Sequence, residues 1–145
     1  MKRLAAAALL ALVPIAGLAT DEHFNVSAAY VPPAKAGAPG AVAVAFLSAD
    51  PDVRINQEPA PRLKLDPAQT VLVDRQPAAA RKAESAGEPK YLDTTLPVNF
   101  PVSLNPKAPK GEQMVKGTVT YFYCSKAEGW CRKGTADVEV PVSVR

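Results

Sequence analysis

The sequence predicts an all-β fold, an antiparallel β-sandwich of about seven or eight short strands. Apolar and polar residues alternate with a period of two in several segments, which is typical of half-buried strands. The 15 prolines and 8 glycines stand at short intervals between these segments. Because proline fixes φ and withholds a donor while glycine tolerates positive φ, these residues exclude long helices over most of the chain.

The N-terminus has the pattern of a cleaved export signal. Lys2 and Arg3 supply a basic start, an apolar run follows from Leu4 to Leu18, and Ala19 is small, as a signal peptidase requires. An uncleaved anchor is the alternative, but the run is shorter than the roughly 20 apolar residues of a membrane span. We therefore expect a signal peptide at residues 1–19. Residues 20–145 then form one domain, periplasmic or secreted, with no stable membrane insertion after cleavage.

Five short strands are predicted in the first half of that domain, separated by turn residues. Their ranges are Phe24–Tyr30, Val42–Leu47, Val53–Asn56, Leu63–Leu65 and Val71–Val73. The one helical candidate is Pro77–Gly87, with proline suited to the first helical position and glycine to the end. It lacks an apolar stripe, so we expect a mobile connection or a frayed surface turn there.

The second half carries the clearest strand patterns. The segment Leu96–Leu104 contains Pro97 and Pro101, which predicts an edge strand or a bulge because proline cannot donate to a ladder. The segments Val115–Cys124 and Ala136–Val144 alternate cleanly and together predict a hairpin. The whole pattern favours a sandwich of immunoglobulin-like type, although a small barrel would show much the same alternation.

Composition excludes several classes of function. Cleavage of the signal leaves 15 of the 17 basic residues against 14 acidic ones, scattered along the chain, so we expect no nucleic-acid binding. The only histidine, His23, lies beside the new terminus, where we expect it to be solvated rather than part of a triad. Two cysteines and one remote histidine do not make a zinc site. No glycine loop leads into a helix, so no cofactor is expected. Asp50 and Asp52 are assigned to solubility.

Cys124 and Cys131 are the two cysteines that remain as candidates for chemistry. One ends the penultimate strand and the other lies just before the last, so their sulfurs should face each other across the hairpin at a separation that permits a disulfide. A closed loop of about eight residues contributes roughly 2–3 kcal/mol, a modest staple. The cations Lys126, Arg132 and Lys133 favour a thiolate and Glu128 opposes it. From spacing alone, a static clip is favoured over a redox pair.

Three segments around this pair resemble a known family. They are Gly117–Cys124, Gly129–Cys131 and Val138–Val144. Together they are similar to the N-terminal extracytoplasmic domain of the thiol:disulfide interchange protein DsbD, in which a strand ending in an aromatic residue and a cysteine leads through a short loop to the second cysteine. Upstream, Val53–Asn56 resembles a His-Ile-Asn segment of that family, with Arg54 where histidine is usual.

The resemblance implies an immunoglobulin-like domain in which Cys124 and Cys131 are the catalytic pair. They would pass electrons to or from thioredoxin-fold proteins through mixed disulfides, and a separate membrane electron donor would supply them. Tyr91 or the segment around Asn56 could cover the sulfurs, and the attacking sulfur stays open. The alternative is a non-catalytic immunoglobulin-like binding or accessory module whose disulfide only fastens its last hairpin.

Overall fold

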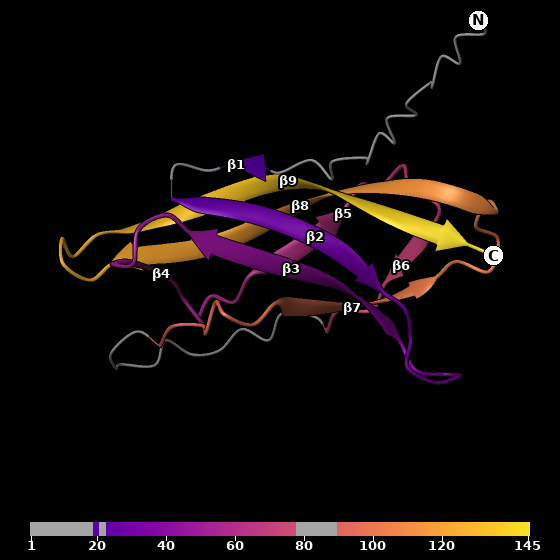
Figure 1. Ribbon diagram of the computed structural model, residues 1–145, viewed down its shortest axis with the longest axis horizontal. Coiled ribbons are helices and arrows are strands. Elements are labelled where there is room, and N and C mark those ends of the chain that lie inside the picture. The colour runs from indigo at the N-terminus through magenta and orange to yellow at the C-terminus, as the bar shows by residue number, and fades with distance from the viewer. Residues whose placement is uncertain (1–18, 21–22, 78–89) are drawn as a thin grey trace, which may run out of the picture.

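The computed structural model describes residues 19–20, 23–77 and 90–145, and over these ranges every regular element is a β-strand (Figure 1). The strands form two antiparallel sheets, which confirms the predicted all-β sandwich. The predicted signal at residues 1–19 lies outside the described residues except for Ala19. The helical candidate at 77–87 also lies outside them except for Pro77. In the described ranges, no helix is long and apolar enough to cross a membrane.

The first sheet has five strands, and each hydrogen-bonds to its neighbours in the order β1-β2-β3-β7-β6. Their bounds are Ala19–Thr20 for β1, Phe24–Val31 for β2, Gly40–Ser48 for β3, Val98–Leu104 for β7 and Leu72–Asp74 for β6. The longest pairing in this sheet joins β2 to β3, from Phe24 opposite Ser48 to Val31 opposite Ala41.

The second sheet is built around one long strand, β8. Its members are β4 (Val53–Ile55), β5 (Arg62–Leu65), β8 (Gly111–Ser125) and β9 (Cys131–Val144). Strand β9 pairs with β8 along nearly its whole length, and β4 and β5 pair with successive parts of β8 on the opposite side. The β8–β9 loop projects at one end of the molecule, beside β4 (Figure 1).

The core lies between the sheets and is filled by the apolar face that the alternation predicts. On β8 and β9 the buried residues of the core are Val115, Val119, Tyr121, Tyr123, Ala136, Val138, Val140 and Val142. They meet buried aromatic and β-branched residues of the facing sheet, chiefly Phe24, Val26, Val42, Val44, Phe46, Phe100 and Val102. Each such side chain contributes about 1.5–3 kcal/mol on removal from water, so these two layers are held together mainly by burial.

The proline-containing segment was predicted to form an edge strand or a bulge, and β7 as a whole forms neither, since its register with both neighbours is one-to-one. Strand β7 lies inside its sheet, between β3 and β6. Pro101 faces Ala41 on the β3 side, and its carbonyl accepts from the backbone N–H of Arg75 at 3.0 Å. Arg75 follows the last residue of β6, so Pro101 lies at the end of the β6–β7 pairing, where the single hydrogen bond from Arg75 is the last one. An internal strand tolerates proline at such a point.

Candidate functional site

Cys124 and Cys131 form a disulfide across the β8–β9 hairpin, with their Cα atoms 4.0 Å apart. The two residues are directly opposite each other in the strand register. Beside them, the backbone N–H of Ser125 donates to the carbonyl of Trp130 at 2.9 Å. This hydrogen bond makes the cysteines a non-hydrogen-bonded pair, the position in an antiparallel ladder where facing residues approach most closely. The structure therefore brings the two predicted site residues together.

The two cysteines have unequal environments. Cys131 is exposed, whereas Cys124 is only 3% exposed. The alternation of β8 points Tyr123 into the core and Cys124 to the outer face of the sheet, so the burial of Cys124 comes from its neighbours on that face. One of these is Arg54, which lies directly opposite Cys124 on β4. The bond thus has one half open to a partner molecule and one half covered.

Residues 90–92 extend the sheet beyond β4 on the side away from β8. Tyr91 forms an isolated antiparallel bridge with Asn56. The N–H of Leu92 donates to Ile55 at 2.9 Å, and the N–H of Gln57 donates to Lys90 at 2.8 Å. Tyr91 and Asn56, the candidates for covering the sulfurs, therefore lie on the outer face in line with Phe122, two residues before Cys124 on β8. Asn56 is 8% exposed, and its Oδ1 atom has no hydrogen-bond partner among the described residues.

The cysteine loop is held by Asp52, a residue from the turn before β4. The hydroxyl of Ser125 donates to Asp52 Oδ2 at 2.6 Å, and the N–H of Ala127 donates to Oδ1 at 3.0 Å. The N–H of Glu128 donates back to the Ser125 hydroxyl at 3.1 Å. The assignment of Asp52 to solubility was therefore wrong. No local pattern could have revealed this role, because Asp52 and Ser125 are 73 positions apart in the chain.

An aromatic cluster covers the end of the core beneath the same hairpin. The ring of His23 lies 5.4 Å from those of Tyr123 and Trp130, measured between centroids. The guanidinium of Arg132 stacks 4.3 Å from the centre of the Trp130 ring. The expectation of a solvated terminal histidine was wrong, since His23 is half-buried and its Nε2 atom is buried without a hydrogen-bond partner among the described residues. Tyr123 faces inward, so the cluster and the sulfurs lie on opposite faces of the hairpin.

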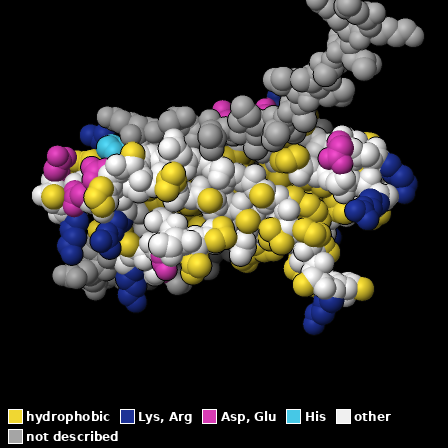
Figure 2. Space-filling view, in the orientation of Figure 1, with side chains coloured by type: hydrophobic (Ala, Val, Ile, Leu, Met, Phe, Trp, Pro, Cys, Tyr) yellow, Lys and Arg dark blue, Asp and Glu magenta, His cyan; other side chains and the backbone are white. Residues whose placement is uncertain are grey.

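Charged side chains of both signs lie around the disulfide. The carboxylate of Asp52 is engaged by the loop, and that of Glu128 accepts a hydrogen bond from the Trp130 indole N–H. Arg54, Lys126 and Lys133 are exposed cations. Basic and acidic side chains lie close together at this end of the molecule (Figure 2). The cations favour thiolate formation at the cysteines, and the carboxylates of Asp52 and Glu128, which stay ionised while they accept hydrogen bonds from neutral donors, oppose it.

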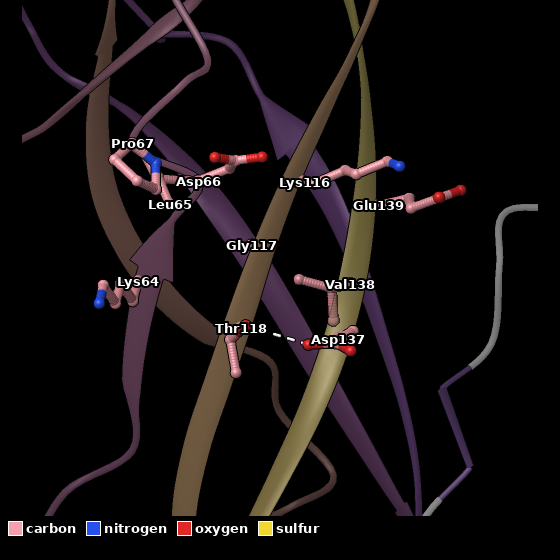
Figure 3. Close-up of a pocket in the computed structure, with 10 residues that line it drawn as sticks. All are labelled: Lys64, Leu65, Asp66, Pro67, Lys116, Gly117, Thr118, Asp137, Val138 and Glu139. Atoms are coloured by element: carbon pink, nitrogen blue, oxygen red, sulfur yellow. Dashed lines mark hydrogen bonds between the residues drawn. The ribbon is translucent and has the colours of Figure 1, made fainter.

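A hollow lies away from the cysteines, on the outer face of β5, β8 and β9 (Figure 3). Gly117 is among the residues that line it, and the charged lining residues are Lys64 and Asp66 at β5, Lys116 on β8, and Asp137 and Glu139 on β9. The Thr118 hydroxyl donates to Asp137 at 3.0 Å. Cys124 lies seven positions beyond Gly117 on β8, which is about 24 Å at the usual rise per residue. This hollow is therefore no part of the cysteine site.

Comparisons of the chain with protein-family models, with curated proteins and with solved structures find no match.

Proposed function

We propose that this domain is an exported thiol-disulfide exchange protein that passes electrons through Cys124 and Cys131 to or from thioredoxin-fold partners. The observation that carries the proposal is the asymmetry of the bond: Cys131 is exposed at the end of an edge strand, while Cys124 is 3% exposed. An exchange disulfide needs one sulfur that a partner thiolate can reach in line with the bond. The resemblance of the surrounding hairpin to an interchange domain supports the same function.

Reduction of the pair takes two displacement steps. A partner thiolate attacks Sγ of Cys131, the Sγ–Sγ bond breaks, and Cys124 leaves with the electron pair as a thiolate. The second partner thiol, as its thiolate, then attacks the partner's own sulfur in the mixed disulfide and releases Cys131 as a thiolate. Two electrons pass from the partner dithiol to the cysteine pair, and the partner becomes a disulfide. The reverse sequence passes the electrons to an oxidised acceptor.

The surrounding structure supports a bond that opens without loss of the fold. Closing a loop of about eight residues contributes only about 2.5 kcal/mol. The hairpin has other sources of stability. The pairing of β8 with β9 extends from Gly111 opposite Val144 as far as the cysteines, and the hydrogen bonds of Asp52 hold the loop without the disulfide. A reduced hairpin can therefore keep its shape and present both thiols to the next partner. The proposed electron source is a separate membrane donor with a reactive dithiol.

Trapping with single-cysteine variants tests this function. In the Cys124→Ser variant, the exposed Cys131 should capture a thioredoxin-fold protein from an extracytoplasmic extract as a stable mixed disulfide, because no internal thiol remains to resolve it. The matched Cys131→Ser variant should capture several-fold less, since Cys124 is 3% exposed. The double variant controls for non-covalent capture. Absence of a trapped partner from both single variants would contradict exchange.

The alternative function is that of a non-catalytic immunoglobulin-like binding or accessory module. The burial of Cys124 and the position of the bond at the end of the hairpin favour it, because a fastener needs no access for thiols. Under this alternative, neither single-cysteine variant captures a thioredoxin-fold protein, and loss of the bond changes stability alone.

A further inference from the structure

Arg54 is the cation that the strand register places beside the buried sulfur. It pairs with Cys124 across β4 and β8, and Cys124 pairs with Cys131 across β8 and β9, so the three residues form one row on the outer face. Facing side chains in such a row have Cβ atoms about 4.5–5.5 Å apart. An arginine side chain is long enough to bring its guanidinium to a sulfur on the facing residue. Arg54 itself is exposed.

The group facing Arg54 from the other side is the carboxylate of Asp93, which forms no ion pair with it. Asp93 follows Tyr91 and Leu92 along β4 and comes opposite Arg54 in that register. Its carboxylate accepts hydrogen bonds from the hydroxyl and the N–H of Thr95, and both lower the pKa of Asp93. Among the described residues, Arg54 makes no ion pair with it or with any other carboxylate. The other charges near the pair are Lys133, opposite Phe122, and those at the loop end, Lys126, Glu128 and Asp52, whose carboxylate binds the hydroxyl of Ser125 next to Cys124.

The proposed exchange creates a specific need for a cation here. Attack on the exposed Cys131 makes Cys124 the leaving group, so a thiolate develops on the cysteine that is 3% exposed. Burial disfavours a charged sulfur, and a cation within a few ångströms offsets that penalty. A leaving thiolate that is better stabilised also departs faster.

We propose that Arg54 stabilises the Cys124 thiolate that leaves when a partner dithiol reduces the disulfide. This inference rests on the proposed exchange function and adds a residue to it. The guanidinium offers its N–H donors to the sulfur as the negative charge develops, and it does not take part in any bond that forms or breaks. The positive charge of Arg54 would therefore both speed reduction of the disulfide and stabilise the reduced cysteine pair.

The test uses the mature protein with Arg54→Gln, and reduced dithiothreitol as the reductant, so that no protein partner is needed. We expect reduction of the disulfide at neutral pH to slow by about threefold to tenfold, because the leaving thiolate loses its cation. In a Cys131→Ser background, the thiolate absorbance of Cys124 should appear at higher pH when Arg54 is replaced. Arg54→Lys should restore most of both effects.

Arg62→Gln is the matched control. Arg62 is an exposed arginine on the same outer face, paired with Thr120 further along β8, and its loss should change neither measurement. Unchanged rate and titration in Arg54→Gln, or equal changes in Arg62→Gln, would overturn the inference. A successful partner capture combined with an unchanged titration would remove the role of Arg54 and leave exchange standing. A shifted titration without any captured partner would support the electrostatic role and contradict exchange.

Discussion

At the scale of single residues, the cysteine loop depends on one carboxylate that is distant in the chain. Asp52 receives the hydroxyl of Ser125 and the N–H of Ala127, and Ser125 in turn receives the N–H of Glu128. Gly129 completes the turn with φ of +72°, a conformation that favours glycine. These contacts hold the loop that leads into Cys131.

Replacement of Asp52 by alanine should destabilise the oxidised domain by about 2 kcal/mol, because two charge-assisted hydrogen bonds are lost and the hydroxyl of the buried Ser125 loses its acceptor. Chemical denaturation of the oxidised protein measures this change. Asp137→Ala is the control, since Asp137 accepts from Thr118 on the exposed face. Its effect should stay within about 0.5 kcal/mol. Equal losses in the two variants would show that Asp52 does not hold the loop.

His23 shows how a residue's environment can escape sequence reasoning. Its place beside the predicted signal peptide indicated a solvated residue, yet its ring packs between Tyr123 and Trp130. The packing follows from the fold, because β2 begins at Phe24 and the β8–β9 hairpin ends above it. No spacing along the chain relates these positions. By contrast, the cysteine pairing was predictable, since both partners belong to one hairpin.

At the scale of elements, the β8–β9 hairpin contains a position that only glycine fits. Gly134 lies opposite Tyr121 in the register, and a Cβ atom there would come within 2.5 Å of the Tyr121 ring. Tyr121 is fully buried and packs against Phe24 and Phe46, so its ring has little room to move. The ring therefore fills the space that a side chain on β9 would occupy, close to the cysteine end of the hairpin.

We expect Gly134→Ala to cost about 1–3 kcal/mol, the usual cost of overpacking a closed core. Urea unfolding of the oxidised protein, followed by tyrosine and tryptophan fluorescence, measures it. The neighbouring Thr135→Ala is the control, because Thr135 is exposed and its loss should change stability by at most about 0.5 kcal/mol. A neutral Gly134→Ala variant would show that Tyr121 is not confined as its contacts indicate.

At the scale of the whole molecule, alternation predicted most of the sandwich. The buried faces of β8 and β9 follow directly from period two, because a strand that covers a core on one face must alternate. The interior place of β7 could not be predicted in this way. Strand order depends on contacts between distant segments, and Pro101 is tolerated only because β6 ends beside it. The burial of Cys124 escaped prediction for the same reason, since its pairing with Arg54 joins positions far apart in the chain.

Access to the two sulfurs is also a property of the whole arrangement. At the cysteine end of the hairpin, β8 lies between β4 and β9. Strand β9 is the edge of this sheet, so no further strand among the described residues lies beyond Cys131. Cys124 is thus placed beside Arg54 and Cys131 beside solvent. This arrangement supports a bond that is attacked from the β9 side and that releases its thiolate toward β4.

The reduction potential of the Cys124–Cys131 pair in the purified mature domain tests exchange most directly. It is measured by equilibration with glutathione buffers of defined ratio. Electron passage to and from thioredoxin-fold partners predicts a value among those of known exchange proteins, between about −120 and −270 mV. A potential well below about −300 mV would mark a structural disulfide and contradict the proposed function.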